Sequence, residues 1–348
     1  MKKVGIIATV ALAVVVAAVV SLCVVRNDGV SRGRSVPHKS FRLAVITPTT
    51  HPSLEQIQQG FKDTLDKDHG YTYAIDVFNA NGNRMLLSSL VEEVARGGYD
   101  LVFTIASQPT LLTKQAMGKH QKSTPIVFGA VSDPVRLGVV QSLSNPGGQV
   151  TGVYEEQGAA QQVPLIKMLH PTTRNVLLVY NPSQGSGLEV TKGEVESNLN
   201  ALGMKLIPLP VYATNEVYSK LQASIGQADM VMVLKDNTVV SALDGVIKLC
   251  NTKHIPLMAS DLDSVAKGAV MGFGVHEYQY GVRGAGLAQR ILKERLKPAQ
   301  LPCIGAGEHR LCLNRSALAT QRLAAPQALL SLLSIIEVIR SSDGGSDA

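Results

Sequence analysis

Short apolar segments alternate with amphipathic segments along most of this 348-residue chain. Runs such as Arg42–Thr47 and Leu101–Ile105 have the length of buried strands, whereas 52–67 repeats its apolar residues at helical spacing. Each parallel strand connection must cross over its sheet, so regular alternation of strands and helices is typical of parallel sheets covered by helices on both faces. The sequence therefore predicts an α/β fold.

The alternation runs twice through the chain, with extended crossings near residues 130–160. We predict two doubly wound parallel-sheet lobes with a hinge and a cleft between them. Lobe 1 is expected at 41–154, with 270–340 returning to pack near it, and lobe 2 at 155–269. The length allows each lobe its own core, and the lack of Trp makes those cores aliphatic.

The N-terminus has the pattern of an export signal or membrane anchor. Lys2 and Lys3 precede an apolar run from Val4 to Val25, which is long enough to span a bilayer as a helix. Lysines at the start of such a segment stay in the cytoplasm, so the rest of the chain would lie outside it. We expect a signal or anchor at 1–26, a polar linker at 27–40 and a disordered tail at 341–348. The body would reside in the periplasm or at the outer face of the cytoplasmic membrane.

Cys23 lies inside this apolar run. Val20-Ser21-Leu22-Cys23 resembles a bacterial lipoprotein processing box, although Leu22 replaces the small residue expected before the cysteine. Three outcomes stay open: lipidation of Cys23, cleavage of the segment as a signal, or its retention as an anchor.

Basic residues near the N-terminus account for most of the net positive charge of the chain. Of the formal charge of +6, residues 1–40 contribute six basic side chains against one acidic, so no basic face for nucleic acid is predicted on the body.

Two other cysteines flank a turn signal. Cys303 and Cys312 stand on either side of Gly305-Ala306-Gly307, which predicts a hairpin that could bring them together as a disulfide. Two unpaired thiols on a partly buried ladder are the alternative. Cys250 falls in a helical pattern and is predicted to be a buried, unreactive thiol.

Polar residues follow the predicted strands in both lobes. Ligands of doubly wound sheets bind at the carboxyl ends of the strands. The candidate ligand-binding residues at these ends are Thr49, Ser107, Asp133, Asn181, Ser186, Asp236 and Asn237. Any one of them could be a helix cap, but their recurrence on both sides of a cleft indicates a site for a small polar ligand.

Several stretches at these ends resemble a known family, the bacterial ABC-transporter substrate-binding proteins of the tryptophan/tyrosine type, with the type I periplasmic binding protein fold. The matching stretches are Thr47-Pro48-Thr49 with His51-Pro52, Ser132-Asp133-Pro134-Val135, Asn145-Pro146-Gly147-Gly148, Tyr180-Asn181-Pro182, Asp236-Asn237 and Lys267-Gly268-Ala269. The resemblance runs from about Phe41 to about Arg340. It implies a monomer that closes by hinge bending on a ligand, most simply an amino acid. It also implies ABC permease and ATPase partners, no cofactor, and binding roles for the seven candidates.

Two departures from the family pattern fall at the expected ligand contact. Gln184-Gly185-Ser186-Gly187 replaces an acidic residue followed by Asn-Ser, and Lys235 replaces a small or hydroxylated residue. A lysine there could pair with an anionic group of the ligand or reach solvent. The ligand could therefore differ from the family's aromatic amino acids.

An enzymatic function has little support in the sequence. The eight histidines show no metal-ligand spacing, no phosphate-binding or dinucleotide motif occurs, and Gly185-Ser186-Gly187 is only a fragment of a hydrolase nucleophile elbow. We predict a non-enzymatic, metal-free binding protein. The alternatives are a membrane-tethered ligand sensor acting through a separate partner and, with less support, an α/β hydrolytic enzyme.

Overall fold

A computed structural model describes residues 39–155, 159–184, 186–324, 326, 329 and 336–339. The predicted segment 1–26 with Cys23 and the tail at 341–348 lie outside this range. The last two residues of the predicted linker, Lys39 and Ser40, already belong to the first strand. No helix within the described range is long and apolar enough to cross a membrane.

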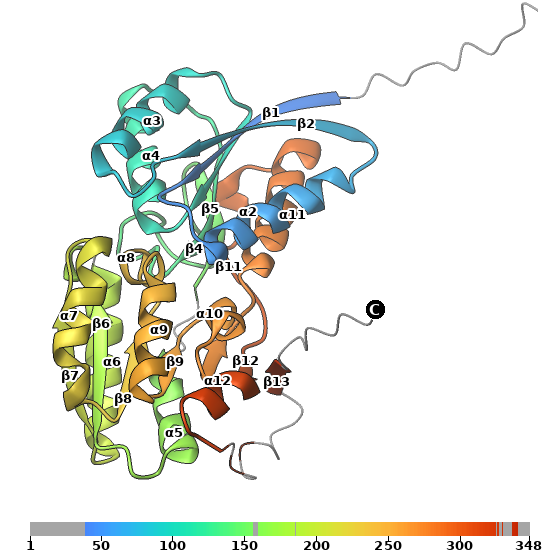
Figure 1. The fold of residues 1–348 in the computed structure, drawn as a ribbon. Helices are drawn as coiled ribbons and strands as arrows, with labels where there is room; N and C mark the ends of the chain where they lie inside the picture. Colours follow the sequence, from blue (N-terminus) through green and yellow to red (C-terminus); the bar gives the residue numbers. More distant parts are fainter. Residues whose placement is uncertain are drawn as a thin grey trace, which may run out of the picture. The chain divides into compact units, whose positions relative to one another are not determined.

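The described residues form two lobes, each built on its own sheet (Figure 1). In spatial order, the first sheet contains β11 (Ile304–Gly305), β5 (Val150–Tyr154), β4 (Ile126–Val131), β3 (Leu101–Ile105), β1 (Lys39–Thr47) and β2 (Tyr71–Asn79). The second contains β13 (Ile336–Ile339), β12 (Arg310–Asn314), β10 (Met271–Gly274), β9 (Leu257–Ala259), β8 (Met230–Val233), β6 (Asn175–Tyr180) and β7 (Lys205–Pro210). The α/β fold with two parallel-sheet lobes is thus confirmed.

Both sheets use the same strand order. In each lobe the first strand lies between the second and the third, and the fourth and fifth strands follow on the side of the third. The order therefore reverses between β1 and β3 in one lobe and between β6 and β8 in the other. At such a switch point the two flanking connections leave in opposite directions and open a crevice at the carboxyl ends of the strands.

Helices cover both faces of each sheet. The helices of the first lobe are α2 (Pro52–Asp66), α3 (Arg84–Arg96), α4 (Ser107–Lys119) and α11 (Tyr278–Glu294). Those of the second are α5 (Ala159–Leu169), α6 (Ser186–Ala201), α7 (Val217–Ser224), α8 (Asn237–Val240), α9 (Leu243–Lys253), α10 (Leu262–Lys267) and α12 (Arg315–Thr320). Short 3-10 turns occupy Pro182–Gln184, Thr214–Glu216, Ile225–Gln227 and Pro298–Gln300.

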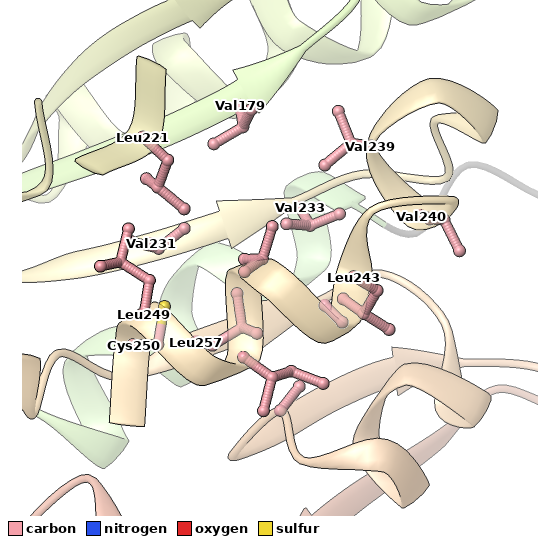
Figure 2. Close-up of a cluster of buried hydrophobic side chains, with 14 of the residues drawn as sticks. Val179, Leu221, Val231, Val233, Val239, Val240, Leu243, Leu249, Cys250 and Leu257 are labelled. Atoms are coloured by element: carbon pink, nitrogen blue, oxygen red, sulfur yellow. The ribbon is translucent and has the colours of Figure 1, made fainter. Parts of the chain in front are cut away.

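The central strands explain this layering, because their side chains alternate between two buried faces. In β1, Leu43 and Val45 pack with α2 and α11, whereas Ala44 and Ile46 pack with α3 and α4. Strand β6 divides its residues in the same way. Its Val179 joins the aliphatic cluster shown in Figure 2, where valines and leucines of β6 and β8 meet those of α7, α8 and α9. Cys250 is buried in this cluster, and burial raises the pKa of its thiol to about 12.

The C-terminal part of the chain corrects the predicted lobe boundaries. Residues 270–340 were expected to pack near lobe 1, but only α11, Pro298–Gln300 and β11 do so. Strand β10 pairs in parallel with β9, and β12 pairs antiparallel with β10, so both belong to the second lobe. The chain passes between the lobes after β5, between β10 and α11, and between β11 and β12.

The predicted hairpin and disulfide are wrong for the same reason. Gly305 ends β11 in the first sheet and Arg310 begins β12 in the second, so the residues between them carry the chain from one lobe to the other. Cys303 is buried in the core of lobe 1 and Cys312 in that of lobe 2, so no disulfide joins them.

Helices α2 and α11 pack so closely that glycine is required at their contact. A Cβ atom on Gly281 would overlap the carbonyl oxygen of Ile57, and one on Gly60 would overlap that of Tyr278. Because Tyr278 and Glu277 begin α11 at the lobe boundary, this contact also fixes where one interlobe connection enters lobe 1.

We expect Gly281→Ala to lower the free energy of unfolding by about 1–3 kcal/mol, because the added methyl group meets backbone rather than a flexible side chain. Gly286→Ala in the same helix is the matched control, since a Cβ there meets nothing within 4 Å. It should be neutral or stabilising by up to about 1 kcal/mol from helix propensity. Denaturant unfolding of both variants measures the difference, and equal effects would contradict this account of the helix contact.

Candidate functional site

A cavity of about 500 Å³ lies between the lobes at the carboxyl ends of the strands. It adjoins both switch points. Residues following β1 and β3 form one wall, and residues following β6 and β8 form the other. Its volume falls in the range of small-molecule sites.

The wall from lobe 1 includes Thr49, which follows β1, and Ser107, which begins α4. Ala106 and Ala130 also line the cavity at the ends of β3 and β4, with φ values of 72° and 56°. A positive φ is costly for a residue with a side chain, and such strain concentrates at functional sites. The backbone strain therefore marks the same strand ends as the polar side chains.

The wall from lobe 2 includes Asn181 and Asn237. The Asn181 side chain donates to Thr238 Oγ1 at 2.9 Å and accepts from the Ser183 backbone N–H at 2.9 Å. These two hydrogen bonds fix the side-chain amide of Asn181 at the end of β6. Asn237 is the first residue of α8, which follows β8.

Two predicted carboxylates do not line the cavity. Asp236 is fully buried and accepts backbone N–H bonds from Asn181, Thr238 and Val239. Asp133 accepts the backbone N–H of Arg136 and closes a turn. Both carboxylates thus bind backbone N–H groups of their own loops. Asp236 positions Asn181 and Asn237 instead of facing the cavity. Ser132 lines the cavity in place of Asp133. The side chain of Ser186 lies outside the part of the chain that the structure describes.

Direct contacts connect the two walls. His51 of lobe 1 meets Asn237 of lobe 2, with 3.0 Å between Nε2 and Oδ1. Burial lowers the pKa of His51, which favours the neutral ring with Nε2–H donating to the amide oxygen. Ser53 donates to Asp261 at 3.5 Å beside it. The lobes therefore touch across the cavity, as expected for a closed binding protein.

A partly buried ion cluster lines the cavity where the lobes are connected. Lys235 Nζ lies 2.8 Å from Glu277 and 3.2 Å from Glu155. Burial raises the pKa of Glu277 from 4.5 to about 7, although Lys235 opposes the rise. Lys235 thus pairs with carboxylates of the protein, a type of partner that the sequence-based alternatives of a ligand anion or solvent did not include.

An aromatic pair lines the same cavity. The Phe273 and His309 rings stack with their centroids 5.3 Å apart. Gln162 supports this wall by donating to the Phe273 carbonyl oxygen at 2.8 Å. Together with the hydroxyl and amide groups, these rings suit an organic ligand that has both polar and apolar parts.

Sequence reasoning missed six of these lining residues. They are Ser132, Glu155, Gln162, Phe273, Glu277 and His309. Choosing the residue directly after β4 and β5 would have found Ser132, which precedes the candidate Asp133, and Glu155. Phe273 and His309 had no such signal, because their segments were assigned to the wrong lobe.

The chain matches the family model described as ABC transporter substrate binding protein over residues 42–334. The tyrosine-binding protein of Clostridioides difficile (strain R20291) is 27% identical over 312 residues, which cover 86% of this chain and 88% of that protein.

Solved structures give the same result. The ABC domain from Streptococcus pneumoniae in complex with L-Trp is 25% identical with a TM-score of 0.79, covering 86% of this chain and 100% of that one. A conserved domain protein from Vibrio cholerae is 30% identical with a TM-score of 0.78, covering 86% and 99%.

The ionisation of Glu277 gives a pH-dependent prediction. Between pH 4.5 and about 7 the unfolded chain has lost this proton while the folded chain keeps it, so stability falls as pH rises through that window. The slope contributed by Glu277 is at most about 1.4 kcal/mol per pH unit. Denaturant unfolding of the wild type and of Glu277→Gln across this window isolates it, because the other titrating groups are common to both. Parallel stability curves for the two proteins would contradict the assignment.

Proposed function

Since this chain belongs to the ABC transporter substrate-binding protein family, we propose that it captures an amino acid with an uncharged side chain in the cavity between its lobes. It is the solute-binding component of an ABC transporter and not an enzyme. The observation that supports the ligand class is the cavity itself, in which hydroxyl and amide groups of both lobes face the stacked rings of Phe273 and His309. The relatives bind tyrosine and tryptophan.

Capture proceeds by closure of the lobes. A ligand that contacts both walls binds the closed state better than the open one and shifts the equilibrium by that difference in affinity. The His51–Asn237 and Ser53–Asp261 contacts join the two lobes beside the cavity, so we expect them to form when the lobes close. They stabilise the closed state without contributing to the open one.

The body acts outside the cytoplasm. The lysines before the apolar run at 4–25 support export with the N-terminus inside, and the run or a lipid on Cys23 would hold the body at the membrane. There the closed body delivers its ligand to a permease driven by an ATPase.

The ligand class is tested by thermal shift and calorimetry of the wild type against the L-amino acids. We expect stabilisation by one or more neutral amino acids, tyrosine and tryptophan among the first to try. Thr49→Val should weaken that binding about 3–10-fold, the loss of one hydrogen bond. Thr50→Val is the matched control, because Thr50 is the next residue, exposed and outside the cavity. No stabilisation by any amino acid would refute the ligand class.

Export is tested by expressing the full chain in a bacterium and adding protease to spheroplasts. We expect digestion of the body from outside and its recovery in the membrane fraction of intact cells. Cys23→Ser separates the two anchors, since it abolishes labelling by palmitate only if the cysteine is lipidated. Protection of the body from added protease would contradict export.

A further inference from the structure

Lys235 occupies one end of the cavity and draws together distant parts of the chain. It follows β8 in lobe 2, whereas Glu155 follows β5 and Glu277 precedes α11. The two glutamates thus lie beside two of the connections between the lobes. All three side chains line the cavity, and that of Glu277 is only 4% exposed.

The lysine ammonium is surrounded by ion-pairing and hydrogen-bonding groups of the protein. It carries three N–H donors, and three oxygens of the protein surround it, from Glu277 at 2.8 Å, Glu155 at 3.2 Å and the Tyr280 hydroxyl at 3.4 Å. Its nitrogen also lies 5.1 Å from the centre of the Tyr280 ring, within the range of a cation–π contact. Such surroundings are those of a bound organic cation.

The charges make this position selective for a cation. Two carboxylates face one ammonium, so the cluster has a formal charge of −1 when both glutamates are ionised. The remaining oxygen of Glu155 accepts from the Ser132 hydroxyl at 2.7 Å, which holds that carboxylate toward the cavity end. Burying either carboxylate without a cation is strongly unfavourable.

We infer that this end of the cavity is an alkylammonium-binding site filled by the protein's own Lys235, and that Lys235 is therefore a specificity-determining residue that excludes ligands with a cationic side chain. A basic amino acid would have to displace an ammonium that is already ion-paired with both glutamates. With Lys235 shortened, the same carboxylates and the Tyr280 ring would bind the cationic end of a ligand. The inferred amine site depends only on the contacts of Lys235 with Glu155, Glu277 and Tyr280. The exclusion of basic amino acids rests in addition on the proposed function.

The test uses Lys235→Ala, which removes three methylenes and the ammonium, and n-propylammonium, which has the same atoms. At pH 8 the variant should melt about 10 °C below the wild type, because the buried Glu277 and the partly buried Glu155 lose their cation. Millimolar n-propylammonium chloride should restore at least half of this loss, by binding the folded state only. Neither 1-propanol nor potassium chloride at the same concentration should restore it, and the wild type should not respond to the amine.

Two further variants keep the outcome decisive. Lys235→Ala with both Glu155→Gln and Glu277→Gln should lose the response to n-propylammonium. If Lys235→Ala does not fold, Lys235→Ala with Glu155→Gln replaces it, because that pair keeps the formal charge of −1 and one carboxylate for the amine. Equal stabilisation by n-propylammonium and 1-propanol in the variant that folds would overturn the inference.

Basic amino acids test the specificity. Calorimetry should show L-lysine or L-ornithine binding Lys235→Ala at least tenfold more tightly than the wild type. Rescue by n-propylammonium without any amino-acid binding to the wild type would keep the cation site and refute the proposed ligand. Binding of neutral amino acids to the wild type without rescue of the variant by n-propylammonium would support the proposed ligand and refute the cation site.

Discussion

The structure depends on the burial of both faces of two parallel sheets. Strands such as β1 and β6 alternate aliphatic side chains between two helical layers, so neither sheet leaves a face for a ligand. Polar groups are left to the strand ends, and the shared strand order concentrates them at one switch point per lobe. The cavity forms where the two switch points face each other, and its chemistry is that of the residues just beyond β1, β3, β6 and β8.

Acidic residues near the cavity serve two different purposes. Asp236 and Asp133 accept backbone N–H groups and hold loops in place. Glu155 and Glu277 instead face a cation, Lys235, at the end where the lobes are connected. Residues of one chemical type thus position the site in one place and set its charge in another. Glu277 also stands at a helix start, as the N-cap of α11, but its side chain pairs with Lys235 instead of capping the helix.

The proposed closure and the proposed selectivity depend on different contacts. The His51–Asn237 and Ser53–Asp261 contacts bridge the lobes where they meet across the cavity, and neither involves a full charge from both partners. The ion cluster lies beside the connections, and its strong pairing does not depend on a ligand. A binding protein must open as well as close, and weak contacts at the moving edge with strong ones near the hinge are compatible with that cycle.

The sequence by itself determined the α/β class, the two lobes and four cavity residues, Thr49, Ser107, Asn181 and Asn237. Strand and helix periodicity are local properties, and the rule that ligands bind at strand ends turns them into positions. Only the tertiary structure decided which sheet receives β10 and β12, because a short strand carries no mark of its partner. That pairing separates Cys303 from Cys312 and brings Phe273 and His309 into the cavity. It also decided that Lys235 faces Glu155 and Glu277, since residues 80 and 42 positions apart in the chain meet only when the connections between the lobes are in place.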